Sequence, residues 1–425
     1  MSAFRRSGRG VGEAAKPLSV LIVAGEASGD QLGAPLMAAL RERLSGQVQF
    51  RGVGGSTMQA QGLQCLFPME DLTAIGIDQV LRKLPTILRR MRELVATAAA
   101  EKPDLAILID SPDFNLRLAK RLRRRMPSLP IVDYVSPTVW VWRPRRAKAM
   151  RPNVDHVLAL YPFEPAVLER LGGPPSTYVG HPLLERLSEL RPSAVERAIR
   201  EASEPTFLVL PGSRNTEIQR LSPVFGETIG RLAELRGRID FALPTLPSKL
   251  AQIETAIATW PVKPRIVTEE KEKFAAFRRA RAALAASGTV TLELALAEVP
   301  TVAAYKVSRL EAPIARRVIR SPSAILPNLI IGENVVPEFH QERCTADNLV
   351  AALEPLFEDS AERRRQTEGF AKLAEIMKVG DERPSVRAAR VTLEVFEKKT
   401  GRADIPLNVI PAEAEGREPG SSEIG

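Results

Sequence analysis

The chain has 425 residues, which is too many for one ordinary core and fits two domains of roughly 200 residues each. Its 44% hydrophobic and 26% charged residues are typical of a globular protein. The formal net charge of +9 favours an anionic partner, such as a phosphorylated substrate or an anionic membrane surface. Nucleic acid is the weakest candidate, because aromatic residues make up only 5% of the chain and do not alternate with basic stretches.

Cysteines and histidines are too scattered to suggest a disulfide framework or a metal site. Cys65 and Cys344 lie far apart without a partner motif, and none of the three histidines is paired at ligand spacing. We therefore expect no metal and no cofactor, and a reducing cytoplasm as the compartment. Because no stretch approaches the ~20 apolar residues of a membrane span, we expect a chain that is soluble or lies on a surface.

The stretch from Pro205 to Arg220 predicts a buried strand, a tight loop and a helix that begins at Asn215. In open α/β sheets, ligands bind beyond the carboxyl ends of the strands, where a glycine lets the backbone come close and a helix N-terminus offers free N–H groups. Gly212, Ser213 and Arg214 suit a diphosphate, since the Arg214 guanidinium is a fixed, forked cation. A plain turn with a solvated Arg214 explains these residues equally well.

The amino-terminal part of the chain repeats this order of elements. A strand from Ser19 to Ala24 leads through the turn Gly25 to Asp30 into a helix from about Gln31 to Leu44. Two such beginnings predict an α/β protein with two doubly wound halves. Further strands are expected at 48–53, 104–109, 131–135, 156–160 and 177–179, and in the second half at 207–210, 240–243, 265–267, 282–286 and 301–304.

The segment from Leu72 to Ala100 carries apolar residues at helical spacing, with lysines and arginines interspersed. A surface helix with a solvated basic face explains this pattern. A basic amphipathic helix that settles onto anionic headgroups explains it as well.

Asp110 directly follows the apolar run Asp104 to Ile109, at the carboxyl end of a predicted buried strand. Such folds keep their chemistry at this position. Asp113 or Ser111 is expected to cap the helix that runs through Leu116 to Arg125, which leaves Asp110 for function.

Two further turns have an ambiguous role. Trp140 and Trp142 share the loop 136–146 with a basic cluster, which predicts either a lid over an amphipathic ligand or a packed corner with a solvated rim. His181 lies in the Gly-His-Pro turn that closes the first half. It suits a general base or a phosphate donor, and a hydrogen-bonded turn residue at least as well.

In the second half, Ser287, Gly288 and Thr289 form another turn that enters a helix. Their N–H groups and hydroxyls suit a phosphate, and Glu293, one helical turn further, suits a ribose diol. An ordinary N-cap explains the same residues. Leu326 to Leu329 is expected to be a loop.

These elements divide the chain into an extension (1–17), a first α/β domain (18–190), a second (191–385), a helix that crosses back (386–400) and a loose tail (401–425). A carboxylate on the first domain and phosphate-binding turns on the second suit the transfer of a group from a nucleotide-activated donor.

Eight short motifs follow one another along about residues 18 to 390. They are GEASGD at Gly25, IDSPDFN at Ile109, YVSPTVWVWRPRR at Tyr134, PFE at Pro162, GHPL at Gly180, LPGSRNTEI at Leu210, SGTVTLE at Ser287 and LPNLI at Leu326. In this order they resemble the lipid-A-disaccharide synthase family. The resemblance implies a GT-B fold of two Rossmann-like domains and an inverting, metal-independent glycosyltransferase. Such an enzyme joins UDP-2,3-diacylglucosamine to 2,3-diacylglucosamine 1-phosphate, giving a β-1,6-linked disaccharide phosphate and UDP, at the cytoplasmic face of the inner membrane.

The resemblance also implies roles for individual residues. Asp110 matches the proposed general base of the family, and Arg214 would neutralise charge on the departing UDP. The positions matched to UDP binding are Gly212, Ser213, Arg214, Ser287, Gly288, Thr289, Glu293 and Asn328, and those matched to the sugar or acceptor are Ser28, Gly29, Asp30, Asp113 and His181. The chain departs from the family pattern at one position: an acidic residue is expected there, and this chain has Gln79, with Asp78 beside it.

Two other functions compete with this one. A hydrolysing UDP-sugar 2-epimerase shares the fold and the nucleotide site, but it needs no lipid surface, so the segment from Leu72 argues against it. A non-enzymatic nucleotide-sugar sensor would leave Asp110 dispensable. As partners we expect the two lipid substrates and an anionic membrane surface, without nucleic acid, and a homodimer stays open.

Overall fold

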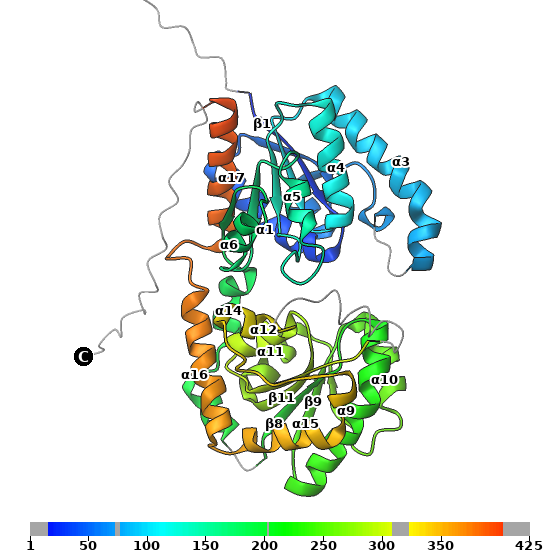
Figure 1. Ribbon diagram of the computed structural model, residues 1–425, viewed down its shortest axis with the longest axis vertical. Helices are drawn as coiled ribbons and strands as arrows, with labels where there is room; N and C mark the ends of the chain where they lie inside the picture. The colour runs from blue at the N-terminus through cyan, green and yellow to red at the C-terminus, as the bar shows by residue number, and fades with distance from the viewer. Residues whose placement is uncertain (1–15, 73–76, 202–203, 308–322, 403–425) are drawn as a thin grey trace, which may run out of the picture.

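Two parallel β-sheets, each flanked by helices, form two stacked domains in the computed structural model (Figure 1). The structure describes residues 16–72, 77–201, 204–307 and 323–402, with the backbone alone for 77–81. Most of the predicted extension and nearly all of the tail lie outside the described residues, as do the side chains of Asp78 and Gln79. The first sheet has the order β3-β2-β1-β4-β5-β6-β7 and the second the order β10-β9-β8-β11-β12-β13.

The central strands of the first sheet, β1 and β4, are short apolar runs that are buried on both faces, as parallel strands between two helical layers must be. Its strands are β1 (Leu18–Ala24), β2 (Val48–Val53), β3 (Leu63–Cys65), β4 (Leu105–Ile109), β5 (Ile131–Tyr134), β6 (His156–Ala159) and β7 (Ser176–Tyr178). The helices of this domain are α1 (Ala27–Arg43), α2 (Ser56–Ala60), α3 (Ile77–Glu101), α4 (Pro112–Arg125), α5 (Arg145–Met150) and α6 (Glu164–Arg170).

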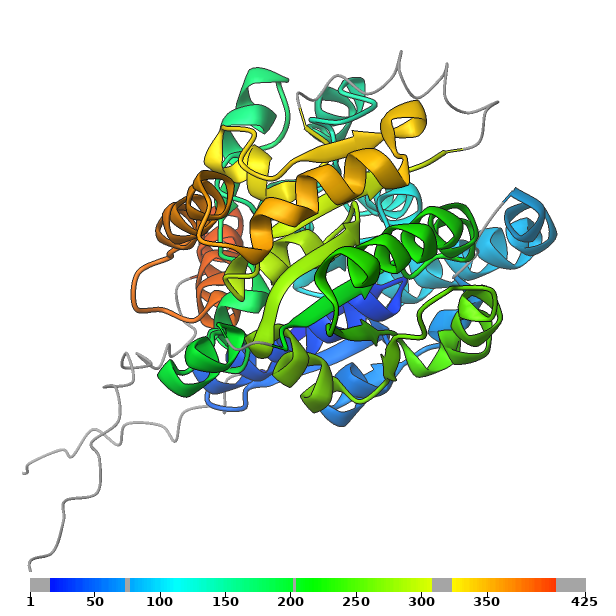
Figure 2. The same ribbon diagram turned by 90° about the horizontal axis from the view of Figure 1, so that it is seen from below.

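The second sheet repeats this construction. Its strands are β8 (Thr206–Leu210), β9 (Asp240–Pro244), β10 (Arg265–Val267), β11 (Ala280–Ala286), β12 (Thr301–Tyr305) and β13 (Glu338–His340). Its helices are α9 (Asn215–Arg236), α10 (Leu250–Ile257), α11 (Glu270–Arg279), α12 (Val290–Leu296), α14 (Leu326–Ile331), α15 (Ala346–Leu353) and α16 (Ala361–Ile376). Seen from below, α9 and α15 lie side by side on one face of the sheet (Figure 2).

The structure corrects several predicted boundaries. Helices α1 and α4 begin four residues earlier than expected, at Ala27 and Pro112. The stretch between β7 and the second domain, for which no helix was predicted, contains α7 (Leu187–Leu190) and α8 (Ala194–Arg200). The predicted loop at Leu326 is the short helix α14, because Pro327 lies in the first turn, where the missing N–H costs nothing.

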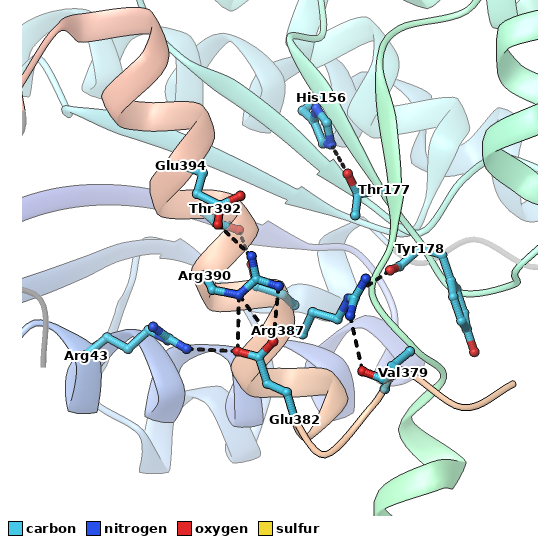
Figure 3. Close-up of polar contacts among 11 residues, drawn as sticks. Arg43, His156, Thr177, Tyr178, Val379, Glu382, Arg387, Arg390, Thr392 and Glu394 are labelled. Carbon is cyan, nitrogen blue, oxygen red and sulfur yellow. Dashed lines mark hydrogen bonds and ion pairs between the residues drawn. The ribbon is translucent and has the colours of Figure 1, made fainter. Parts of the chain in front are cut away.

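The last helix, α17 (Pro384–Thr400), packs on α1 of the first domain, although α16 before it belongs to the second (Figure 1). Between these helices, Glu382 accepts hydrogen bonds from Arg43 of α1 at 2.9 Å and from Arg390 of α17 at 3.1 to 3.3 Å (Figure 3). Arg387 donates to the carbonyl oxygens of Tyr178 and Val379, both at 3.1 Å. The chain therefore connects the two domains twice, first between β7 and β8 and again between α16 and α17.

Candidate active site

Each sheet has one topological switch point, where neighbouring strands lead to helices on opposite faces. In the first sheet this point lies between β1 and β4, and in the second between β8 and β11. The loops beyond these four strands carry the candidate residues, since ligands of open α/β sheets bind outside the carboxyl ends at the switch point. This topology brings the loop with Ser28 beside the loop with Asp110, and the loop with Arg214 beside the loop with Ser287.

Asp110 lies in a tight left-handed turn at the end of β4. Asp110 and Ser111 have φ values of 54° and 43°, which non-glycine residues rarely adopt. The buried Asn115 stabilises the turn, because its Nδ2 donates to the carbonyl oxygens of Ile109 at 3.0 Å and Asp110 at 2.8 Å. The Ser28 hydroxyl donates to Asp110 Oδ2 at 2.7 Å and so joins the loops after β1 and β4. Such strained backbone is typical of functional sites.

Arg214 occupies the N-cap position of α9, and its side chain is 76% exposed. Its guanidinium donates to Glu217 Oε1 at 2.7 Å, while the amides of Ser213 and Arg214 both donate to Glu217 Oε2 at 3.3 Å. Gly212 has a φ of 109°, and a Cβ there would lie 2.6 Å from Glu217 Oε2. A diphosphate bound to these amides would replace the Glu217 carboxylate.

The second turn of this domain, after β11, lies beside the first because β11 pairs with β8. Gly288 and Thr289 are exposed, and a Cβ on Gly288 would meet no atom within 4 Å. The Ser287 hydroxyl donates to the carbonyl oxygen of Ala324 at 3.0 Å, and Glu293 forms an ion pair with Lys273. The exposed backbone at Gly288 and Thr289 is open to a ligand.

Comparison with known proteins identifies the family. A family described as lipid-A-disaccharide synthetase matches residues 20–389. Lipid-A-disaccharide synthase of Rhodopseudomonas palustris (strain HaA2) is 55% identical over 379 residues, which make up 89% of this chain and 96% of that protein. The synthase of Rhodospirillum centenum is 42% identical over 411 residues, or 96% of this chain and 99% of that protein. The chain belongs to the lipid-A-disaccharide synthase family.

Solved structures agree on the fold of this lipid-A-disaccharide synthase family member. A UDP-N-acetylglucosamine 2-epimerase described as putative, from Listeria monocytogenes, has a TM-score of 0.59 at 13% identity, covering 93% of this chain and all of that one. UDP-GlcNAc 2-epimerase from Neisseria meningitidis has a TM-score of 0.55 at 11% identity, covering 90% and 99%. The predicted GT-B fold is confirmed, and the chain is a glycosyltransferase of lipid A biosynthesis.

The family motif GEASGD also contains a carboxylate that the sequence did not single out. Glu26 is the second residue after β1. Partial burial and the negative charge of Asp110 raise its pKa, and the positive charge of Arg214 lowers it. The charge of Arg214 therefore acts on a residue of the other domain. The signal in the sequence that could have identified Glu26 is its position, two residues beyond a buried strand.

Three of the matched residues make contacts that favour a structural role. The buried Asp30 carboxylate accepts from the amides of Gly55, Thr57 and Met58 at 2.8 to 3.1 Å. The buried Asn328 side chain donates hydrogen bonds to Val336 O and Glu338 Oε1, and it accepts hydrogen bonds from the amides of Val335 and Val336. Both the donor and the acceptor of its side-chain amide are therefore engaged within the protein. Gly29 lies against the end of β1, since a Cβ there would be 3.1 Å from Ala24 Cβ.

The predicted cap of α4 is Asp113 or Ser111, and Asp113 does not occupy the N-cap position. The N-cap position is Ser111, whose side chain makes no capping hydrogen bond. Asp113 instead forms ion pairs with Arg143, in the loop after β5 that carries Trp140 and Trp142 (the tryptophan loop), and with Arg146, in the first turn of α5. This loop therefore lies beside the first turn of α4.

The His181 side chain is neutral near pH 7. Burial lowers its pKa to about 4, and its Nδ1 accepts from the Leu183 amide at 3.2 Å, which places the ring proton on Nε2. The ring stacks on Tyr161 with 5.5 Å between the centroids. His181 is thus suited to donate a hydrogen bond from Nε2, and not to serve as a general base.

Two buried carboxyl groups lie behind the site. Burial, followed by the negative charge of Asp110, raises the pKa of Asp133 well above its usual value, and its Oδ2 has no hydrogen-bond partner among the described residues. Burial raises the pKa of Glu164 to about 8, although the backbone amides of Tyr161 and Leu160 oppose the shift. Glu164 therefore favours the protonated form near neutral pH.

The described residues contain no group of three or more histidine, cysteine, aspartate or glutamate side chains placed to hold a metal ion. Among the helices of the same residues, none has the length and apolar character needed to cross a bilayer.

Proposed function

We propose that this protein transfers the diacylglucosaminyl group of UDP-2,3-diacylglucosamine to the 6-hydroxyl of 2,3-diacylglucosamine 1-phosphate. The products are the β-1,6-linked disaccharide phosphate and UDP. One observation carries the proposal: Asp110 lies at the switch point of one domain, and Arg214 lies at that of the other. A base on one domain suits an acceptor bound to that domain, and a cation on the other domain suits a nucleotide bound there.

In this mechanism the Asp110 carboxylate takes the proton of the acceptor 6-hydroxyl. The freed oxygen bonds to the anomeric carbon of the donor, while the bond from that carbon to the UDP oxygen breaks. Attack from the face opposite UDP inverts the anomeric centre. Arg214 neutralises the charge that grows on the leaving diphosphate, together with the loop amides after Gly212. The open turn at Gly288 and Thr289 completes the nucleotide site.

We also propose that α3 rests on the cytoplasmic face of the inner membrane. Its second half packs into the first domain through Met91, Leu94 and Ala98. Its first half exposes Leu84, at 37%, together with the basic side chains of Arg82 and Arg89. An apolar residue between cations suits the boundary between headgroups and acyl chains, where both lipid substrates lie.

The test is an assay of the purified protein with both substrates and EDTA, followed by mass spectrometry. Acceptor-dependent formation of disaccharide phosphate and UDP in equal amounts is the expected result. UDP release without acceptor would point to a hydrolytic or epimerase-like reaction. Tight UDP binding without turnover would point to a sensor.

A further inference from the structure

The tryptophan loop, residues 135–144 with Trp140 and Trp142, and the first turn of α5 carry a basic cluster that the proposed mechanism does not use. The loop 135–144 follows β5, which lies beside β4, so it emerges at the same edge of the sheet as Asp110. Trp140 anchors the loop, because its ring packs edge-on against Tyr161 and Phe163 with centroids 6.1 and 5.2 Å apart. Trp142 is 37% exposed. The packed-corner interpretation therefore fits Trp140, while Trp142 stays partly exposed.

Trp142, Arg143, Arg146 and Asp113 form one preorganised unit, the Trp142 cluster. Trp142 Nε1 donates to Thr138 Oγ1 at 3.1 Å, which fixes the ring. The guanidinium carbons of Arg143 and Arg146 lie 4.1 and 5.9 Å from the ring centroid. Arg143 has a φ of 53°, a conformation that non-glycine residues seldom adopt. Strained backbone and stacked guanidinium groups are typical of a binding element.

The charges of this cluster do not balance. Both Arg143 and Arg146 face Asp113, and the Asp113 side chain is 67% exposed. One solvated carboxylate between two guanidinium groups leaves a net positive charge, and a dianion with several acceptor oxygens can take its place. Arginine is the side chain best suited to hold phosphate through paired hydrogen bonds.

The position of the cluster relative to Asp110 indicates which phosphate group it would bind. Asp113 lies three residues after Asp110 in the chain, in the first turn of α4, so the cluster stands beside the turn that carries Asp110. We propose that Arg143 and Arg146 bind the 1-phosphate of the acceptor sugar. This inference rests on the proposed function, in which the acceptor carries its phosphate on C1 and its reactive 6-hydroxyl on the carbon attached to C5, so that the two groups flank the ring oxygen of one hexose. Phosphate on the cluster would direct the 6-hydroxyl towards Asp110.

The test compares the natural acceptor with 2,3-diacylglucosamine that lacks the phosphate, in detergent micelles. The variants are Arg143→Ala and the conservative Arg146→Lys, with the exposed Arg124→Ala on α4 as the control. For both cluster variants we expect the KM of the phosphorylated acceptor to rise about tenfold or more, corresponding to the loss of a charge-assisted hydrogen bond. The KM of the donor and the activity with the dephosphorylated acceptor should match those of the wild type.

Equal effects on both acceptors, or an unchanged KM in both variants, would overturn the assignment. Sedimentation with phosphatidylglycerol vesicles identifies the competing role: variants that lose vesicle binding but keep the acceptor KM would make the cluster a membrane contact. If the wild type forms disaccharide from neither acceptor, the proposed function fails and the inference falls with it. Wild-type activity with an intact KM in both variants refutes the inference alone.

Discussion

The Ser28 hydroxyl donates a 2.7 Å hydrogen bond to Asp110 Oδ2 and thereby couples the loops beyond β1 and β4. These residues are 82 positions apart in the chain, and they meet because the two strands are neighbours in the sheet. The bond leaves the other carboxylate oxygen of Asp110 available to a substrate. It also orients the group that we propose as the base.

Replacing Asn115 by Ala should cost both stability and activity. Its Nδ2 supports the left-handed turn at Asp110, and the loss leaves two carbonyl oxygens without this donor in a buried position. We expect the free energy of unfolding to fall by about 1–3 kcal/mol, together with a lower kcat. Urea denaturation and initial rates measure the two effects. Asn153→Ala, which removes a single exposed bond to Ala149, should change neither.

Arg214→Ala should weaken UDP binding about 10- to 100-fold, the equivalent of one or two charge-assisted hydrogen bonds. Isothermal titration calorimetry with UDP measures the change. The control is Arg238→Ala, because Arg238 is 88% exposed and pairs only weakly with Glu204 at 3.2 Å in the same domain. An unaltered affinity in the Arg214 variant would remove this residue from the nucleotide site.

Glu382→Ala should loosen the attachment of α17 to the first domain. The change leaves Arg43, which is 9% exposed, without its carboxylate partner, and it also breaks the pair with Arg390 (Figure 3). We expect a loss of about 1–3 kcal/mol in the free energy of unfolding, measured by urea denaturation. Glu333→Ala breaks an ion pair with Lys372 in which both side chains are more than half exposed, and it should have little effect. Similar values for the two variants would show that the Glu382 network adds nothing.

Much of the fold was predictable because the strands are short apolar runs that both helical layers bury. The predicted bounds of β2 and β10 are those of the structure. The roles of Asp30 and Asn328 were not predictable in this way, since their partners come from a neighbouring loop or strand that a motif does not reveal. Glu26 was missed for a related reason: its importance depends on Asp110 and Arg214, which are far away in the chain.

Glu164 gives a prediction for the pH dependence of stability. Its pKa is about 8 in the folded protein and near 4.5 when unfolded, so the folded state binds more protons between these values. The contribution of Glu164 therefore falls as the pH rises from about 4.5 to 8, with a limiting slope of about 1.4 kcal/mol per pH unit. Relative to the wild type, Glu164→Gln should become more stable between pH 5 and pH 8. The exposed Glu169→Gln should show no such trend, and parallel curves for Glu164→Gln and the wild type would contradict the assignment.

The central claim is that Asp110 is the base that activates the acceptor, and Asp110→Asn tests it most directly. Asparagine keeps the shape of the side chain and can still accept the Ser28 hydrogen bond, but it cannot take a proton. We predict an unchanged Kd for UDP and a kcat lower by about 10²- to 10⁴-fold, the usual contribution of a general base. Wild-type turnover in this variant, with UDP binding intact, would contradict the mechanism.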